Sequence, residues 1–404
     1  MEQKPIFSIE ARDASSRARA GTVTTAHGTF PTPAFMPVGT RASVKAVDPR
    51  DLRELGATIV LSNTFHLMLR PGAELIASLG GLHAFMGWDG PILTDSGGFQ
   101  VYSLAGLRKL SAEGLEFRSP YDGGRFFFTP ERAVEVQTLL GSDIMMCLDE
   151  CTPYPASEAE AEASMGLTLD WARRSKAAWR GGEGGGAPQG PSGTTPGGPP
   201  AAAPGASAEE RGLLLFGICQ GGFHRALRER SAADLAELGL PGYAAGGLAL
   251  GEPREVMLEA AETSLSVLPE GKPRYLMGLG TPQDVLDGIR LGADMFDCVI
   301  PTRNARNGQL FTRRGPLNIR NSRFRGDPLP PDPDCGCLTC RSFSRAYLRH
   351  LQSQNEPLFP RLATVHNLAF YQDLVRGARK SLLDGSFACY HKQFLDAYAS
   401  GSPD

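Results

Sequence analysis

Short apolar runs rich in β-prone residues recur along the chain, and stretches of helical character separate most of them. Eight such runs occupy residues 32–38, 57–61, 91–94, 143–148, 213–219, 243–248, 274–278 and 295–300. Buried strands that alternate with helices form a parallel sheet, because each helix returns the chain to the end of the sheet at which the previous strand began. Eight strand–helix units predict a (β/α)8 TIM barrel, with a doubly wound open sheet as the alternative.

Start signals for helices support this prediction. The tripeptides at 129–131 and 281–283 both begin with Thr-Pro, which places a capping residue before a proline at the first helical position. Ser157 and Glu160 have the spacing of a capping box for another helix. Helices are therefore expected to begin at three of the crossovers.

Three segments depart from a plain barrel. Residues 114–129 read as a β-hairpin inserted after the third strand. Residues at about 181–208 are almost all Gly, Pro, Ala and Ser, which bury too little apolar surface to offset chain entropy, so a disordered loop is expected. A cysteine cluster and amphipathic helices follow near the C-terminus. We expect a barrel with an N-terminal β lid over 1–319, and a zinc-binding helical subdomain packed on it over 320–404.

Charge narrows the class of partner. The chain has 404 residues, 41% of them hydrophobic, and a formal net charge of -3, so any nucleic-acid binding must come from a local patch. Residues 303–325 contain seven arginines and neither Asp nor Glu. This stretch suits a phosphate backbone, although a merely solvated basic face is the alternative.

Neither a targeting segment nor a membrane span is evident. Residues 1–10 lack the apolar core of a signal peptide. No later stretch has the roughly 18 consecutive apolar residues of a spanning helix. We therefore expect a cytoplasmic protein that makes no membrane contact.

Four potential metal ligands occur near the C-terminus. Cys335, Cys337 and Cys340 lie within six residues, and His366 follows on a predicted helix. Zinc prefers thiolate and imidazole ligands, and a site with four protein ligands leaves no open position for chemistry. The spacing predicts one structural zinc ion per subunit, with cysteines in an unrelated core as the alternative.

Polar residues stand at the predicted C-terminal ends of the strands, where barrel enzymes carry their active sites. They are Asp95, Asp149, Gln220, Gly247 and Asp297. Two neighbouring carboxylates allow one to attack a glycosidic carbon while the other handles the proton. A cap or a turn would explain one such aspartate, but five polar strand ends favour a site.

At these positions the chain resembles the bacterial tRNA-guanine transglycosylases. The resemblance covers nearly the whole chain outside the Gly/Pro-rich loop. Its motifs are Asn-Thr-Phe-His-Leu at 63–67, Thr-Asp-Ser-Gly-Gly-Phe-Gln at 94–100, Leu-Asp-Glu-Cys at 148–151, Gln-Gly-Gly at 220–222, Gly-Gly-Leu at 246–248, Phe-Asp-Cys at 296–298 and the cysteine–histidine cluster. It implies a modified (β/α)8 barrel with a zinc subdomain.

The resemblance also implies a double displacement at the wobble guanosine of tRNAs for Asp, Asn, His and Tyr, in queuosine biosynthesis. Asp297 would be the nucleophile that forms a covalent ribosyl enzyme, and Asp95 the general acid/base for the incoming base. No ATP or redox cofactor would be needed. The base would contact Asp95, Phe99, Asp149, Cys151, Gln220, Gly247, Leu248 and Met277, with Phe99 and Met277 on its two faces.

The identity of the incoming base follows from finer features of the resemblance. Cys151 and the lack of an extra RNA-binding domain favour 7-aminomethyl-7-deazaguanine (preQ1), the base of bacterial members, over queuine or the cyano analogue. Leu250 stands where a smaller β-branched residue is expected, so it bears on the width of the pocket.

Two further contacts are implied by the resemblance. Arg303 and Arg306 would recognise RNA beside the wobble guanine. Phe343, Tyr347 and His350 have the spacing of one helical face. They could be plain core, but an aromatic cluster here favours a homodimer.

The sequence leaves two alternative functions. A non-catalytic RNA-binding homologue would be expected to lose the carboxylates, whereas Asp95 and Asp297 are both present. An unrelated zinc-stapled glycoside hydrolase would be expected to carry sugar-stacking tryptophans near these residues. The chain has only Trp88, Trp171 and Trp179, so an enzyme acting on tRNA is favoured.

Overall fold

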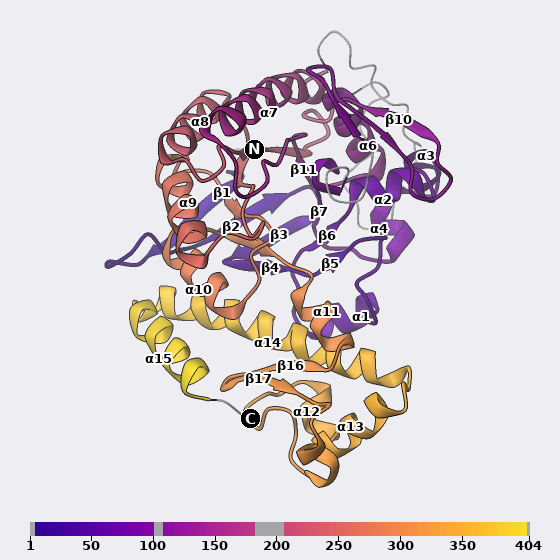
Figure 1. Cartoon of the computed structure of the whole chain (residues 1–404), viewed down its shortest axis with the longest axis vertical. Helices are drawn as coiled ribbons and strands as arrows, with labels where there is room; N and C mark the ends of the chain where they lie inside the picture. The colour runs from indigo at the N-terminus through magenta and orange to yellow at the C-terminus, as the bar shows by residue number, and fades with distance from the viewer. Residues whose placement is uncertain (1–4, 101–107, 182–205, 402–404) are drawn as a thin grey trace.

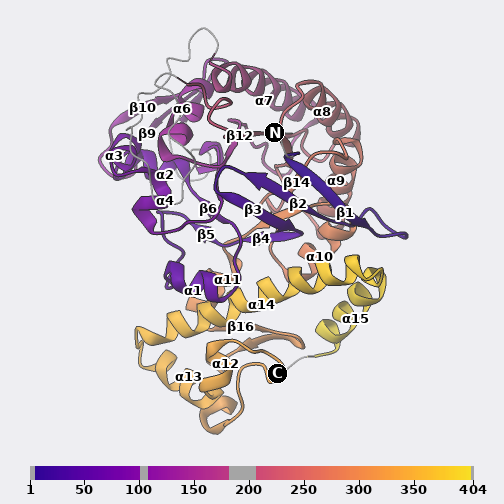
Figure 2. The same ribbon diagram turned by 180° about the vertical axis from the view of Figure 1, so that it is seen from behind.

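The structure is a computed structural model that describes residues 5–100, 108–181 and 206–401. The disordered loop expected at about 181–208 lies mostly outside the described residues, between 182 and 205. Figures 1 and 2 show a larger α/β part and a smaller C-terminal part with one long helix between them. In the described part of the chain, no helix combines the length and apolar character needed to cross a membrane.

A parallel barrel forms the larger part and confirms the predicted fold. Its first strand is split by Pro37, which has no N–H for the ladder, although the Pro37 carbonyl still accepts from Leu61 N–H at 3.0 Å. The two halves pair with the strands at opposite ends of the sheet, so the sheet closes. In spatial order the strands are β4 (Ala34–Met36), β15 (Met295–Asp297), β14 (Arg274–Leu276), β13 (Gly242–Ala245), β12 (Leu214–Cys219), β11 (Ile144–Met146), β7 (Ile92–Thr94), β6 (Val60–Ser62) and β5 (Val38–Gly39).

Helices cover the outside of the barrel, and the three predicted start signals are confirmed. The side chains of Thr129 and Thr281 each cap a helix by accepting a backbone N–H. Ser157 and Glu160 make both hydrogen bonds of a capping box. The helices are α1 (Pro49–Glu54), α2 (Thr64–Leu69), α3 (Ala73–Ser78), α4 (Gly81–Met86), α6 (Pro130–Leu140), α7 (Glu158–Trp179), α8 (Arg225–Glu237), α9 (Arg254–Val267), α10 (Pro282–Arg290) and α11 (Ile300–Arg306).

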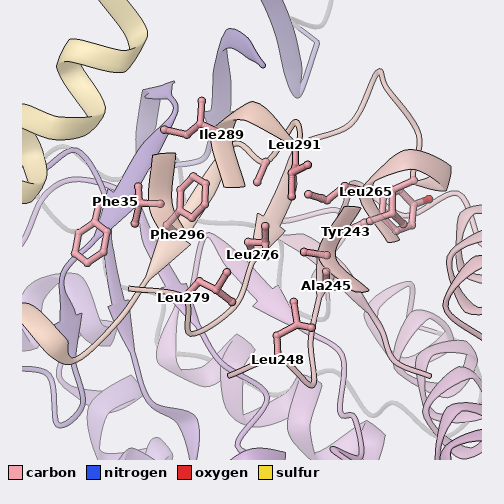
Figure 3. Close-up of a cluster of buried hydrophobic side chains, with 14 of the residues drawn as sticks. Phe35, Tyr243, Ala245, Leu248, Leu265, Leu276, Leu279, Ile289, Leu291 and Phe296 are labelled. Atoms are coloured by element: carbon pink, nitrogen blue, oxygen red, sulfur yellow. The ribbon is translucent and has the colours of Figure 1, made fainter. Parts of the chain in front are cut away.

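Figure 3 shows part of the apolar layer between strands and helices. Leu276 and Phe296 from neighbouring strands pack in one buried cluster with Ile289, Leu291 and Phe35. Burial of such a layer supplies most of the favourable free energy of folding. It fixes the strands whose C-terminal ends carry the site.

The insertion after β7 is larger than the sequence predicted. The expected hairpin is present as β9 (Leu115–Arg118) and β10 (Arg125–Phe128). A further antiparallel strand, β8 (Arg108–Leu110), pairs with β9. This strand is too short and too polar to show an alternating pattern in the sequence.

The turn between the second and third strands of an N-terminal antiparallel sheet is tied to the barrel by a buried aspartate. Asp143 accepts at 2.9 Å from the backbone N–H of His27 and, with its other oxygen, at 2.8 Å from the N–H of Ile92. The rings of His27 and His83 also contact this carboxylate and stack on each other, so its oxygens are already satisfied. The sheet consists of β1 (Phe7–Arg12), β2 (Arg19–Thr25) and β3 (Gly28–Thr32).

The C-terminal part is organised around its longest helix, which runs between it and the barrel (Figures 1 and 2). Its residues are buried nearly all round, because it contacts the barrel on one side and the C-terminal hairpin on the other. The predicted apolar stripe Leu362, Val365, Leu368, Ala369 and Phe370 is buried. The elements are β16 (Gln309–Thr312), β17 (Gly315–Asn318), a 3-10 turn (Ser322–Gly326), α12 (Leu338–Ser342), α13 (Arg345–Ser353), α14 (Leu358–Leu383) and α15 (Phe387–Ser400).

The three aromatic residues near the metal cluster do not share one helix, contrary to the predicted helical face. Phe343 ends α12 in an extended conformation, and only Tyr347 and His350 lie on α13. Ser344 caps α13 through its side chain, which breaks the helix between the first two. The rings of Phe343 and Tyr347 nevertheless stack, with centroids 5.4 Å apart.

Candidate active site

Asp95 follows the end of β7 and is held by the start of α2. The Asn63 amide donates to Asp95 Oδ2 at 2.5 Å, and the Thr64 N–H donates to Oδ1 at 3.0 Å. Burial raises the pKa of Asp95 to about 7, and the charge of Asp297 adds to this rise, whereas the Thr64 N–H opposes it. Near neutral pH this carboxyl group can therefore both take up and release a proton.

Asp297 ends β15 and stands partly exposed at the same end of the barrel. Its Oδ1 accepts from the Tyr275 hydroxyl at 2.5 Å and from the Gly278 N–H at 2.9 Å. Burial raises the pKa of Asp297, while the Tyr275 bond lowers it. Because the charge of Asp297 perturbs Asp95, the two carboxylates lie close enough to interact electrostatically.

Asp149 and Gln220 form a buried polar pair beside these carboxylates. Gln220 Nε2 donates to Asp149 Oδ2 at 2.8 Å, and the Ser96 hydroxyl donates to Oδ1 at 3.0 Å. The Cys151 thiol also lies 3.7 Å from Asp149 Oδ2. Gln220 Oε1 is buried and finds no hydrogen-bond partner in the described part of the chain. An unpaired buried acceptor is costly, so it suits a ligand that brings an N–H group.

The backbone at residues 246–248 lies close to Gln220. Together with Asp149 and Gln220 it forms what we call the wall of the site. Gly247 has φ +66, and a Cβ there would lie 2.3 Å from Gln220 Oε1, so a side chain is excluded. Leu248 is buried, and Met277 lies against Gly246. The remaining predicted face residue, Phe99, lies in the helical residues 98–100 that follow β7 and is 43% exposed.

The structure thus places all the residues predicted for the base at the C-terminal ends of the strands. They come from the ends of β7, β11, β12, β13 and β14 and the segments that follow. Leu250 is partly buried in the loop after β13. No single segment of the chain could form this wall alone.

Several residues in the site carried no predicted role, although the motif at 63–67 includes two of them. Asn63 and Thr64 follow the predicted strand 57–61, so the strand-end rule could have found them. Tyr275 counted as an apolar member of its run, which concealed its hydroxyl. A Cβ at Gly98 would lie 2.7 Å from the Asp149 carbonyl, so this glycine allows the segments after β7 and β11 to approach each other.

The predicted RNA-contacting arginines lie on α11, immediately after Asp297. Arg303 and Arg306 are exposed. Among the residues that the structure describes, neither forms an ion pair with a carboxylate; Arg306 instead donates to the Thr302 carbonyl at 2.9 Å. Their charge is therefore available to an external anion.

Cys335, Cys337, Cys340 and His366 come together as predicted, and they could hold a metal ion. Their ligand atoms lie within 4.8 Å of one another, and His366 Nδ1 lies 3.7 Å from Cys337 Sγ and 3.2 Å from Cys340 Sγ. Tetrahedral zinc, with bonds of about 2.0–2.3 Å, separates its ligand atoms by about 3.5–3.8 Å, so the group fits. His366 Nε2 lies 2.7 Å from the Phe311 carbonyl, which leaves Nδ1 for the metal.

Comparisons with known proteins show the family of the chain. A family model described as queuine tRNA-ribosyltransferase matches residues 13–400. A queuine tRNA-ribosyltransferase of Acidithiobacillus ferrooxidans is 51% identical over 398 residues, 98% of either chain. Another, of Solidesulfovibrio magneticus, is 50% identical over 395 residues, again 98% of either chain. The chain therefore belongs to the queuine tRNA-ribosyltransferase family and is a tRNA-guanine transglycosylase.

Proposed function

We propose that this enzyme exchanges the anticodon wobble guanine of tRNAs for Asp, Asn, His and Tyr for 7-aminomethyl-7-deazaguanine, as a step of queuosine biosynthesis in the cytoplasm. The observation that carries the proposal is the placement of Asp95 and Asp297 at the end of the barrel that also holds the Asp149–Gln220 pair. Two carboxylates and a wall for a flat base are what a double displacement at a nucleoside requires.

In the first step Asp297 attacks the anomeric carbon of the flipped-out guanosine. The Tyr275 hydroxyl and the Gly278 N–H both occupy Oδ1, so Oδ2 is left to form the bond to carbon. The bond from that carbon to the guanine nitrogen breaks, and guanine leaves with the electron pair and takes up a proton from the protonated form of Asp95. The product is a covalent ribosyl ester of the enzyme.

In the second step the incoming base attacks the same carbon and releases Asp297. Asp95 takes the proton from the ring nitrogen that attacks, a role that a pKa of about 7 suits. Two displacements give net retention of configuration. One glycosidic bond replaces another, so no energy-rich cofactor enters the balance.

The loop after β13 supports an aminomethyl base. Glu252 accepts the backbone N–H of Ala249 at 2.6 Å and that of Leu250 at 2.7 Å. Because C=O and N–H of a trans peptide point in opposite directions, the Leu248 carbonyl is directed away from Glu252. A carbonyl accepts a hydrogen bond from an ammonium group, whereas a cyano group has no hydrogen to donate.

Labelled guanine tests this function directly. We expect the enzyme to incorporate it into unmodified tRNA bearing a wobble guanine, and 7-aminomethyl-7-deazaguanine to displace it irreversibly from the RNA. The cyano analogue and queuine, supplied at the same concentration, should compete poorly. Failure of guanine to enter the RNA would contradict the exchange, and equal use of the three bases would contradict the substrate assignment.

The second step should depend on pH through Asp95. Because only its ionised form can take the proton, the rate should rise with pH and level off above the pKa of about 7. Asn63→Ala removes a hydrogen bond that favours the ionised form, so it should raise the pKa and shift the inflection to higher pH. Single-turnover rates between pH 5.5 and 8.5 would show this. A flat profile in the wild type would contradict the role of Asp95.

The remaining predictions concern the scaffold. We infer that the metal is zinc, held by the Cys335 loop and α14, where it supplies a closed four-ligand cross-link and takes no part in the exchange. We retain the division of the chain at 319/320 as a proposal.

The rings of Phe343 and Tyr347 stack, and Tyr347 is 39% exposed beside Pro328 and Pro330. This aromatic pair supports contact with a second copy of the chain.

A further inference from the structure

We propose that Arg228 is a positioning residue for base recognition: it fixes the direction of the peptide groups at Gly246, Gly247 and Leu248 so that N–H donors face the bound base. This inference rests on the proposed function, because it concerns the same wall. It assigns a role to a buried cation that takes no part in the chemical steps.

Arg228 lies on α8, behind the wall, and is fully buried at 0% exposure. In the described part of the chain it forms no ion pair with a carboxylate. Its guanidinium instead donates to backbone carbonyls from the loops that follow β12 and β13. Nε donates to Gly222 O at 2.7 Å, Nη1 to Gly246 O at 2.8 Å and Cys219 O at 3.4 Å, and Nη2 to Gly247 O at 3.3 Å.

The contacts with Gly246 and Gly247 determine which way two N–H groups point. In a trans peptide the carbonyl of one residue and the N–H of the next are antiparallel. With the Gly246 and Gly247 carbonyls turned toward Arg228, the N–H groups of Gly247 and Leu248 are turned away from it. The Gly247 N–H accordingly points toward the Cys151 thiol, which lies beside Asp149 and Gln220.

Glu252 does the converse one peptide further along. It accepts the N–H groups of Ala249 and Leu250, so a cation orients the carbonyls at 246 and 247 while an anion orients the amides at 249 and 250. The positive charge of Arg228 is thus balanced mainly by carbonyl dipoles rather than by a bonded carboxylate. Glycines at 246 and 247 can adopt either peptide direction readily, which is why the segment needs an external orienting group.

A donor that faces the base should recognise a carbonyl oxygen on it. Guanine has this oxygen, whereas 2-aminopurine lacks both the oxygen and the neighbouring N1–H, so the change in the ratio of their dissociation constants between wild type and variant reports the contact. We would determine both constants by calorimetry with the full-length protein and no RNA, which requires no turnover. The wild type should prefer guanine, and Arg228→Met should reduce this preference by about tenfold, the effect of one buried hydrogen bond.

Two further variants separate positioning from stability. Arg228→Lys keeps the charge but cannot span the carbonyls of both loops, so it should lose part of the preference; it carries the test if Arg228→Met does not fold. Arg274→Met is the matched control, because Arg274 is also buried and also donates to a backbone carbonyl, that of Leu268. Arg274 stands at the start of β14, whereas the site lies at the C-terminal ends of the strands. Arg274→Met should lower the melting temperature and keep the wild-type preference.

The outcomes are distinct. An unchanged guanine preference in folded Arg228→Met or Arg228→Lys would overturn the positioning role and leave the proposed function standing. An equal loss of guanine preference in Arg274→Met would mean that general destabilisation causes the effect, and this would also overturn the positioning role of Arg228. If the wild type bound neither base, or bound both equally, the proposed base site itself would fall, and this inference with it.

Discussion

Asp297→Asn should lower the rate of base exchange by about ten-thousandfold or more, the usual cost of removing a covalent nucleophile. An amide cannot form the ester to the anomeric carbon, although it retains the shape of the carboxylate. Its side chain can still accept from Tyr275 and Gly278, so the site should remain assembled. RNA affinity should change little, because the arginines of α11 are untouched.

Asp297→Asn and the wild type should be compared in both exchange rate and tRNA affinity. Incorporation of labelled guanine gives the rate, and a filter or mobility assay gives the affinity for tRNA. Asp396→Asn makes the same chemical change at an exposed position on the C-terminal helix α15 and should match the wild type. Substantial exchange by Asp297→Asn would refute the assignment of the nucleophile.

Cys340→Ser should release the metal and weaken the C-terminal part and tRNA binding together. Cys337, Cys340 and His366 are buried, and His366 also ties α14 to the Phe311 carbonyl. Without the ion these groups lose the partner that links the cysteine loop to α14, at a cost of more than about 3 kcal/mol. Since α14 packs against α11, the arginines on α11 would lose their support.

Metal content, thermal unfolding and tRNA affinity measured on one preparation would test this. Cys389→Ser is the matched control, because Cys389 is a free, exposed thiol on α15 and lies outside the ligand cluster. It should retain metal, stability and binding. A metal-free Cys340→Ser protein with full activity would contradict the structural role of the ion.

Much of the architecture was predictable because it depends on local patterns. The apolar runs gave the barrel strands, the Thr-Pro signals gave the starts of α6 and α10, and the spacing of Cys335, Cys337 and Cys340 indicated the metal cluster. Each of these features is recorded in a few consecutive residues. The same holds for aspartates at strand ends, since parallel strands bring their C-terminal ends to one side.

What could not be predicted depends on contacts between distant segments. The raised pKa of Asp95 arises from burial and from Asp297, two hundred residues away. Tyr275 was hidden in an apolar run, and Arg228 resembled an ordinary helix residue until the carbonyls around it were known. Phe343 was assigned to the wrong helix because the break at Ser344 has no strong sequence signal.

In the proposed mechanism Asp297 becomes bonded to the ribose at the wobble position. Wild-type enzyme mixed with unmodified tRNA in the absence of free base, then denatured and digested with protease and nuclease, would give a peptide that carries the ribosyl adduct. We expect mass spectrometry to locate the adduct at Asp297. An adduct at Asp95, or exchange that proceeds without any covalent enzyme–RNA species, would contradict it.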